Sequence, residues 1–237
     1  MIDKNSMTYW CPLIRNLPIP QPKTIIVKLR ADYWDIMAVC DGDGTAIETQ
    51  MDEIQEACDY IGTPLFLRTS HTSGKHSWND TCYVSDFSKI RQHISALVVD
   101  TAWKEIGIEA LVFREYIEMN STFTAFRGKM PVNPERRYFI RDGKIQCHHP
   151  YWVEESIAES DKPFAAIGKS NLVPNWRELL AVLNTETPEE VVLLSKYALV
   201  VADVLHGYWS VDFCMAKDEN WYLIDCALGE SSWHPEH

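Results

Sequence analysis

Residues 64–84 read PLFLRTSHTSGKHSWNDTCYV, and this stretch constrains the fold more than any other part of the chain. Two apolar, strand-like runs flank a polar loop of about ten residues, whereas ordinary hairpins turn in two to five. The two runs predict antiparallel neighbours in a sheet. Long loops between paired strands are more often functional than decorative.

The centre of this loop carries Gly74 and Lys75. Glycine lets the backbone turn where a side chain would clash, and the lysine ammonium lies beside the freed N–H groups, so the pair suits phosphate oxygens. The pattern is not a P-loop, because the first glycine would fall at Thr69 and His76 replaces the Ser or Thr that holds magnesium. A solvated lysine on a turn explains the loop equally well when the loop is judged alone.

Helical and strand-like patterns alternate along the rest of the chain. Thr45 and Glu48 have the spacing of a capping box at the start of a helix over residues 45–61. Asp142 and Gly143 are a hairpin turn signal. Further helices are expected at residues 86–106, 174–183 and 188–206, and strands at residues 24–29, 111–117, 138–140, 144–147, 209–215 and 221–226.

This order of elements predicts an α+β fold with two lobes. The front lobe, residues 1–110, carries the long hairpin. The larger lobe, residues 111–237, holds antiparallel strands backed by helices. A cleft between two such lobes is a natural ligand site.

Composition limits the classes of partner. The net charge is −12 and the pI is near 5.1, so we expect no broad nucleic-acid surface. No run approaches membrane-spanning length and the N-terminus lacks the apolar core of a signal peptide, which predicts a cytoplasmic protein without a membrane partner. The seven cysteines include no CxxC pair, and the simplest interpretation is that they are reduced and structural.

Two acids lie near the end of the chain, Asp212 in WSVDF and Asp225 in WYLID. Each is expected at or near a strand interior, where an unpaired carboxylate is costly. Adjacent strands would bring them within several ångströms of each other, and like charges so close need a counter-charge. Magnesium, which takes one or two carboxylates plus phosphate oxygens, supplies it. A turn cap or an arginine partner is the alternative for either acid.

Residues 135–145, ERRYFIRDGKI, alternate charged and apolar side chains. Glu135, Arg137 and Phe139 share one face of the expected strand, and the residues between them share the other. An arginine fork beside a carboxylate suits a phosphate or a substrate carboxylate. An exposed strand with cross-strand ion pairs explains the segment at least as well.

Residues 113–119, FREYIEM, place Arg114, Tyr116 and Glu118 on one face of a strand, with Glu115 on the other. A strand that runs into a polar turn can act as a hinge, with backbone toward an adenine edge and a carboxylate toward the ribose. Nothing in the segment alone requires this.

Histidine and cysteine chemistry is harder to place from the sequence. His148 and His149 are adjacent on an expected strand, so they point to opposite faces and are poor joint metal ligands. No grouping of a nucleophile with a histidine can be inferred from spacing, because such groups assemble only in three dimensions.

Taken together and in this order, these segments resemble the ATP-grasp superfamily, and most closely a branch common in phage and bacterial genomes. The matching pattern runs FLRTSHTSGKHSW, FREYIEMNSTFTAF, PVNPERRYFIRDGKIQCHHPYW, VDF and WYLIDCALGESS, within residues 65–232. The resemblance implies an ATP-grasp fold, in which two lobes with antiparallel sheets and flanking helices surround a nucleotide cleft. It also implies ATP and Mg²⁺ as cofactors.

The resemblance assigns roles in the front half of the chain. Lys75, with Arg68 nearby in the loop, looks like the lysine that grips nucleotide phosphates and assists catalysis. Glu115, Tyr116 and Glu118 look like the hinge that binds adenine and ribose, with Glu118 the expected ribose partner. The hairpin tip would then be a lid over the triphosphate, with its hydroxyls and N–H groups donating to phosphate oxygens.

The resemblance also assigns roles in the second half. Arg137 looks like the family's catalytic arginine, directed at phosphate or at the reacting group. Asp212 and Asp225 look like the two acids that hold magnesium. Many relatives end in an acid-x-Asn triplet, whereas Cys and Ala follow Asp225 here, so Glu230 is expected to substitute as a metal ligand.

The implied activity is that of an ATP-dependent ligase. ATP would phosphorylate a carboxylate, and an amine, or less readily a thiol, would attack the acyl phosphate. The expected partners are the nucleotide and this substrate pair, with a peptide or protein among the candidates. The alternative is a nucleotide-binding assembly chaperone of the same fold without ligase activity, similar to those that help to build eukaryotic translation-initiation complexes.

Overall fold

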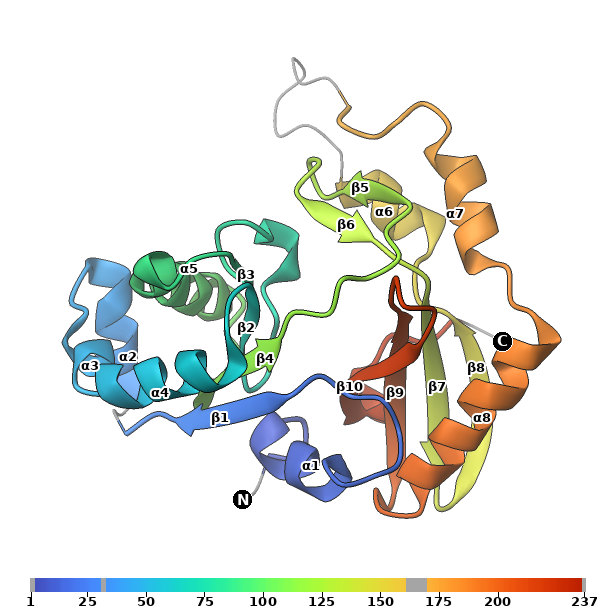
Figure 1. The fold of residues 1–237 in the computed structure, drawn as a ribbon, viewed down its shortest axis with the longest axis horizontal. Coiled ribbons are helices and arrows are strands. Elements are labelled where there is room, and N and C mark those ends of the chain that lie inside the picture. The colour runs from blue at the N-terminus through green and yellow to red at the C-terminus, as the bar shows by residue number, and fades with distance from the viewer. Residues whose placement is uncertain (1–2, 31–32, 161–169, 236–237) are drawn as a thin grey trace. The chain divides into compact units, whose positions relative to one another are not determined.

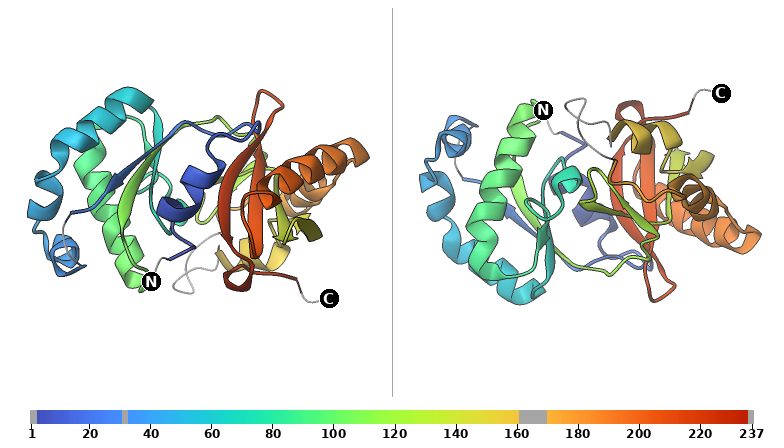
Figure 2. Two further views of the ribbon diagram at one scale, coloured as in Figure 1. Left: turned by 90° about the horizontal axis from the view of Figure 1, so that it is seen from below. Right: turned by 90° about the horizontal axis from the view of Figure 1, so that it is seen from above.

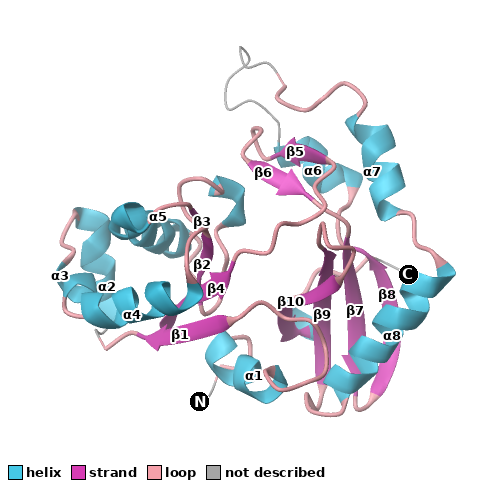
Figure 3. Ribbon diagram, in the orientation of Figure 1, coloured by secondary structure: helices cyan, strands magenta, loops and turns pink. Residues whose placement is uncertain are grey.

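The computed structural model describes residues 3–30, 33–160 and 170–235 (Figure 1). The chain divides into two compact units. Unit 2 is Pro22–Ile117, and unit 1 combines Met1–Gln21 with Glu118–His237. Each unit has its own antiparallel sheet and its own helices (Figure 3), which confirms the expected α+β class.

Unit 2 is built on a four-stranded antiparallel sheet in the order β1-β4-β2-β3. The two arms of the long hairpin are β2 (Leu65–Thr69) and β3 (Tyr83–Val84), and they pair as predicted. Strand β4 (Ala110–Glu115) pairs with the other edge of β2. The remaining elements are β1 (Thr24–Lys28), α2 (Tyr33–Ala38), α3 (Thr45–Glu48), α4 (Met51–Ile61), α5 (Ile90–Trp103) and the 3-10 turns η1 (Val39–Asp41), η2 (Lys75–Ser77) and η3 (Phe87–Lys89).

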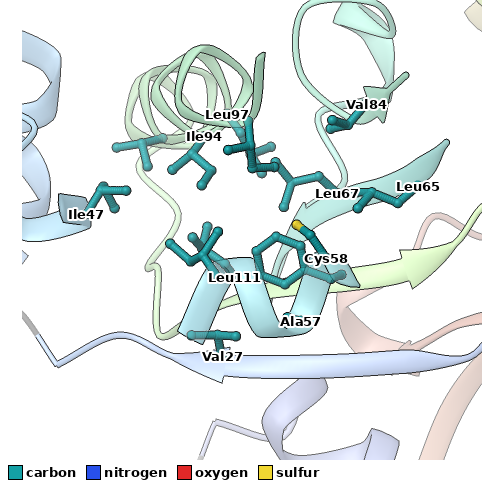
Figure 4. Close-up of a cluster of buried hydrophobic side chains, with 14 of the residues drawn as sticks. Val27, Ile47, Ala57, Cys58, Leu65, Leu67, Val84, Ile94, Leu97 and Leu111 are labelled. Carbon is teal, nitrogen blue, oxygen red and sulfur yellow. The ribbon is translucent and has the colours of Figure 1, made fainter. Parts of the chain in front are cut away.

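The core of unit 2 lies between this sheet and helices α4 and α5 (Figure 4). Leu65 and Leu67 alternate along β2 and are fully buried on one face, as the apolar pattern of that arm predicts. They pack with Cys58 of α4 and Leu97 of α5. Each such side chain contributes about 1.5–3 kcal/mol through removal from water, so the core fixes which face of β2 points away from it.

The predicted capping box at the start of the first long helix is wrong. Gly44 is the N-cap of α3, and Asp43 accepts hydrogen bonds from the N–H and the hydroxyl of Thr45 at 2.9 and 2.5 Å. Glu48 pairs instead with Arg91 of α5, at 2.5 and 3.0 Å. A carboxylate two residues earlier in the chain therefore takes the role that the spacing assigned to threonine.

Unit 1 is built on a four-stranded antiparallel sheet in the order β10-β9-β7-β8. Helix α8 (Pro188–Ala202) lies along one face of it (Figure 2) and begins where predicted, with Thr187 as its N-cap. In the described ranges, no helix combines the length and the apolar character needed to cross a membrane. The other elements are α1 (Met7–Ile14), β5 (Phe123–Ala125), β6 (Met130–Val132), β7 (Glu135–Arg141), β8 (Lys144–Pro150), α6 (Glu154–Ser160), α7 (Trp176–Asn184), β9 (Tyr208–Met215), β10 (Trp221–Leu228) and η4 (Gly229–Ser231).

The hairpin turn predicted at Asp142 and Gly143 connects β7 to β8, with Arg141 opposite Lys144. Both turn residues have positive φ, 46° and 79°. A two-residue turn of this kind matches the right-handed twist of the strands, and glycine and aspartate tolerate it. The sequence signal was therefore sufficient to fix the register of this strand pair.

The first 21 residues pack in unit 1, whereas the expected division placed them in a front lobe of residues 1–110. Tyr9 stacks on Trp209 with ring centroids 6.1 Å apart, and Asn5 accepts a hydrogen bond from the N–H of Leu228 at 2.8 Å. The expected boundary before residue 111 would also separate β4 from the sheet of unit 2. The division of the chain into a phosphate-binding lobe and a metal-binding lobe stays a prediction.

Arg136 holds the helical layer of unit 1 to the sheet. Its side chain is 1% exposed and donates to Glu190 of α8 at 2.6 Å, and to the carbonyl oxygens of Leu183 and Thr185 at 3.1 Å each. These partners lie at the end of α7 and the start of α8. A buried guanidinium with this many acceptors fixes the connection between the two helices.

We therefore expect Arg136→Ala to lower the free energy of unfolding by about 3–5 kcal/mol, because it leaves the Glu190 carboxylate without its charge partner in a buried environment. Arg177→Ala is the matched control, since Arg177 pairs with Glu154 at 2.5 Å on the surface and should change stability by less than about 1 kcal/mol. Urea unfolding followed by tryptophan fluorescence measures both. Similar losses for the two variants would show that Arg136 is not the anchor.

Candidate functional site

One face of the unit 1 sheet carries a row of polar residues, one from each strand. Asp225 of β10 is opposite Asp212 of β9, which is opposite Arg137 of β7, which is opposite His149 of β8. Directly opposite residues in antiparallel strands point to the same face and lie close together. The structure thus brings together the three residues of the second half that were predicted to bind phosphate and magnesium.

A β-bulge gives Asp225 its place in this row. The register shifts between Leu223 and Asp225, so Leu223 is opposite Phe213 while Asp225 is opposite Asp212. Without the extra residue, Ile224 would be opposite Asp212 and the carboxylate would lie on the other face. Bulges are common next to functional sites, where they redirect a side chain.

Arg137 and Asp212 form a bidentate ion pair. The arginine Nε and Nη2 donate to the two carboxylate oxygens at 2.8 and 2.7 Å. The guanidinium also lies 4.6 Å from the centroid of the Tyr151 ring, and its Nη1 donates to the carbonyl oxygen of Trp233 at 3.4 Å. Burial alone would lower the pKa of Arg137, but the Coulombic and hydrogen-bond interactions with Asp212 raise it, so the arginine is always charged.

The two aspartates are a suitable donor set for Mg²⁺. Their carboxylates are on one face of adjacent strands, and each carboxylate oxygen keeps a second lone pair when it accepts a hydrogen bond. Asp225 accepts from the N–H of Cys226 at 3.1 Å. Glu230 lies beyond the strand, exposed in η4. Among the described residues, no group of three or more histidines, cysteines and acids is arranged to hold a metal alone, so phosphate oxygens would complete the coordination.

The centre of the long loop in unit 2 is tightly packed. Gly74 has φ +60°, and a Cβ there would lie 2.9 Å from Leu97 Cδ1 and 3.2 Å from Thr81 Oγ1. The hydroxyl of Thr81 donates to the Gly74 carbonyl oxygen at 2.7 Å. Lys75 follows immediately, half-buried at the start of η2. This loop is therefore a built structure that fixes where the lysine begins.

Trp78 explains the aromatic residue at the tip of the hairpin. Its ring stacks on Tyr83 at 6.3 Å and meets the edge of Tyr116 at 6.5 Å, with Phe66 at 5.6 Å. Tyr83 and Tyr116 are themselves 4.9 Å apart. The aromatic cluster connects the loop to the residue predicted to lie at the hinge, within the same unit.

Some loop hydroxyls are already engaged. The Thr69 hydroxyl accepts from the N–H of Thr72 at 3.0 Å and donates to its carbonyl oxygen at 3.2 Å. Together with Thr81, it stabilises the loop itself, so these groups are less suited to donate to phosphate than the sequence suggested. The phosphate-binding roles of the loop stay predictions.

Arg68 lies in β2 rather than in the loop, and it is 4% exposed. A residue not selected from the sequence, Arg114 of β4, lies near it. Phe66 is opposite Arg114 and Arg68 is opposite Val112, so the two arginines are diagonal neighbours on the sheet face away from the core. The signal was the alternation in LFLRT and FREYI, which puts each arginine between apolar residues of the opposite face.

The predicted hinge residues fall at the junction of the two units. Glu115 accepts a hydrogen bond from the N–H of Lys23 at 3.2 Å, and its own N–H donates to the Lys23 carbonyl oxygen at 2.8 Å. Glu118, the first residue of the following part of unit 1, is exposed and pairs with Lys217. Their roles toward adenine and ribose stay predictions.

A cavity of about 350 Å³ in unit 2 is lined by polar side chains, including Asp80, Tyr83, Lys89 and His93. It contains none of the predicted site residues. His93 is buried and makes a hydrogen bond from Nδ1 to the carbonyl oxygen of Thr81 at 3.1 Å, so it supports the end of the long loop.

The antiparallel sheets and the row of acids and arginine define the class of protein as one with an ATP-grasp fold. The chain belongs to an ATP-grasp domain family, family 3 of its clade, whose family model matches residues 59–237. The superfamily inferred from the motifs is thereby confirmed, and its phage and bacterial branch stays a prediction. A comparison with curated protein sequences finds no match.

Solved structures show the same fold. C-terminally truncated Cdc123 from Schizosaccharomyces pombe is similar with a TM-score of 0.56 and 13% identity, over 96% of this chain and 86% of that chain. VanG D-Ala:D-Ser ligase from Enterococcus faecalis has a TM-score of 0.52 and 11% identity, over 94% and 52%. The ADP complex of purK, N5-carboxyaminoimidazole ribonucleotide synthetase, has a TM-score of 0.51 and 13% identity, over 94% and 44%. The chain thus spans about half the length of these two enzymes.

The packing at Gly74 gives a test of the loop. We expect Gly74→Ala to destabilise unit 2 by about 1–3 kcal/mol, because the new Cβ meets Leu97 and the backbone is left-handed. Gly107→Ala is the control, since nothing lies within 4 Å of a Cβ at that position. Thermal unfolding measures both. Equal midpoints would show that the loop rearranges without cost.

Proposed function

We propose that this protein is a magnesium-dependent ATP-grasp ligase that activates a carboxylate as an acyl phosphate for attack by an amine. The observation that carries the proposal is the row of Asp225, Asp212 and Arg137 on adjacent strands of a chain that belongs to the ATP-grasp family. This row offers two carboxylates and a guanidinium on one face, which is what a metal–triphosphate complex requires. A thiol is a less favoured acceptor.

The proposed binding roles follow the predicted residues. Lys75 and Arg68 of unit 2 bind phosphate oxygens, and Glu115, Tyr116 and Glu118 bind adenine and ribose. Asp212 and Asp225, with Glu230, hold Mg²⁺, which when bound neutralises charge on the phosphate oxygens.

Arg137 is proposed to act on the group being transferred. In the structure its fork is occupied by Asp212 and its third side by the Trp233 carbonyl oxygen. A ligand phosphate would take part of this fork, since arginine binds phosphate and carboxylate with the same bidentate geometry. Positive charge from Arg137 and Lys75 then stabilises the charge that develops as the γ-phosphoryl group moves.

The second candidate is a nucleotide-binding assembly factor without ligase activity. The closed Arg137–Asp212 pair and the Cys226-Ala227 sequence after Asp225 favour it, because both reduce the groups available to a metal. Product analysis separates the two candidates. Incubation with ATP, Mg²⁺ and mixed carboxylates and amines yields ADP and an adduct for a ligase, whereas tight ATP binding without turnover and a stable protein partner indicate an assembly factor.

For the ligase, we expect Asp225→Asn to lower magnesium-dependent ADP formation roughly 100-fold or more, because one anionic ligand of the metal–triphosphate complex is lost. Asp203→Asn is the control, since Asp203 is exposed at the C-cap of α8. ADP release at fixed ATP, with and without Mg²⁺, is the measurement. Unchanged turnover in Asp225→Asn would contradict the metal assignment.

A further inference from the structure

Cys147 and His234 are far apart in the sequence but touch in the structure. Cys147 Sγ lies 3.1 Å from His234 Nε2. The other ring nitrogen, Nδ1, is 2.6 Å from the carbonyl oxygen of Pro235. A carbonyl oxygen only accepts, so Nδ1 carries the proton and Nε2 is the lone-pair acceptor that faces the thiol. A thiol, an accepting imidazole and a group that orients the imidazole form the arrangement of an activated nucleophile.

This pair lies on the face of the sheet that carries the proposed site. Cys147 is opposite Phe139, and the next residue of β8 on that face, His149, is opposite Arg137. Cys147 and Arg137 are therefore diagonal neighbours, a relation that corresponds to about 7–8 Å between Cα atoms. The His234 ring is held against Phe139, with centroids 4.5 Å apart.

The segment that supplies His234 also reaches the arginine. The carbonyl oxygen of Trp233 accepts from Arg137, and the Trp233 ring meets the edge of His149 at 5.4 Å. His149 Nδ1 is 2.7 Å from the Pro150 carbonyl oxygen, so its Nε2 is also an acceptor. This Nε2 is buried and has no hydrogen-bond partner among the described residues. An N–H donor of a substrate would satisfy it.

The thiol needs a base to react. Burial raises the pKa of Cys147, so the thiol is protonated near neutral pH and is a weak nucleophile by itself. The sulfur atoms of Cys82 and Cys214 face backbone carbonyl oxygens, which cannot take a proton. Cys147 faces an imidazole that can.

We propose that Cys147 and His234 form a nucleophile–base pair that receives the acyl group as a thioester before it passes to the amine. This inference rests on the proposed function. The substrate class is a carboxylate activated as an acyl phosphate, held beside Arg137.

In the first step, His234 Nε2 takes the proton from Cys147 Sγ and the sulfur–carbon bond forms. The carbon–oxygen bond to phosphate breaks, with its electron pair leaving on inorganic phosphate. The amine nitrogen then attacks the thioester carbon and the carbon–sulfur bond breaks. The amine proton passes through His234 to the thiolate, which restores the starting thiol.

The first experiment tests the pair without nucleotide. Site-resolved iodoacetamide labelling, read by mass spectrometry, should show Cys147 reacting at least about tenfold more slowly in His234→Phe than in the unmodified protein. Phenylalanine keeps the ring packing on Phe139 and removes the base. His206→Ala, an exposed position, is the control. An equal or faster rate in His234→Phe would overturn the pair, and it would leave the ligase proposal standing.

The second experiment tests acyl transfer. With ATP, Mg²⁺ and a carboxylate panel but no amine, Cys147 should gain an acyl mass that hydroxylamine removes, and Cys147→Ala should lose amide formation while Cys40→Ser keeps it. Amide formation that persists in Cys147→Ala overturns the thioester step and retains the ligase. An absence of ADP in the unmodified protein overturns both the ligase and the acyl transfer, whatever the labelling rates.

Discussion

The pleat of strand β7 is the constraint on which the rest of unit 1 depends. Arg136 and Arg137 are consecutive, so they lie on opposite faces of one sheet. One is sealed against α8 and the connection from α7, and the other joins the row of acids. A register slip of a single residue would exchange the two environments, and the buried acceptors of Arg136 would then lose their donor. Anchor and site are thus set by the same alternation.

The charges of the row partly compensate one another. Asp212 and Asp225 are like charges on adjacent strands, and Arg137 supplies the opposite charge through two short hydrogen bonds. Taking such a pair out of water costs several kcal/mol per ion, which the mutual attraction only partly offsets. A cation that binds the acids and an anion that binds the arginine would each replace one half of the pair. The closed pair is therefore an exchangeable arrangement.

Much of the fold follows from local sequence patterns. The hairpin arms of residues 64–84, the Asp142–Gly143 turn and the strands that carry the two late aspartates all form where periodicity and turn chemistry place them. The bulge before Asp225 could not be predicted, because it depends on how β10 pairs with β9 rather than on any residue within it. The Thr45 cap was wrong since a nearer carboxylate competes for the same N–H group. The Cys147–His234 contact joins strand β8 to a segment after β10, and no spacing rule detects such a contact.

The composition of unit 1 from both ends of the chain has a consequence for its synthesis. Unit 2 is continuous, so all of its residues are available once Ile117 has been translated. Helix α1 emerges first, yet Tyr9 stacks on Trp209 and Asn5 binds Leu228, near the other end. Trp10 and Met7, both buried in the finished protein, have to wait on the ribosome for strands that do not yet exist. The first helix made is among the last to find its place.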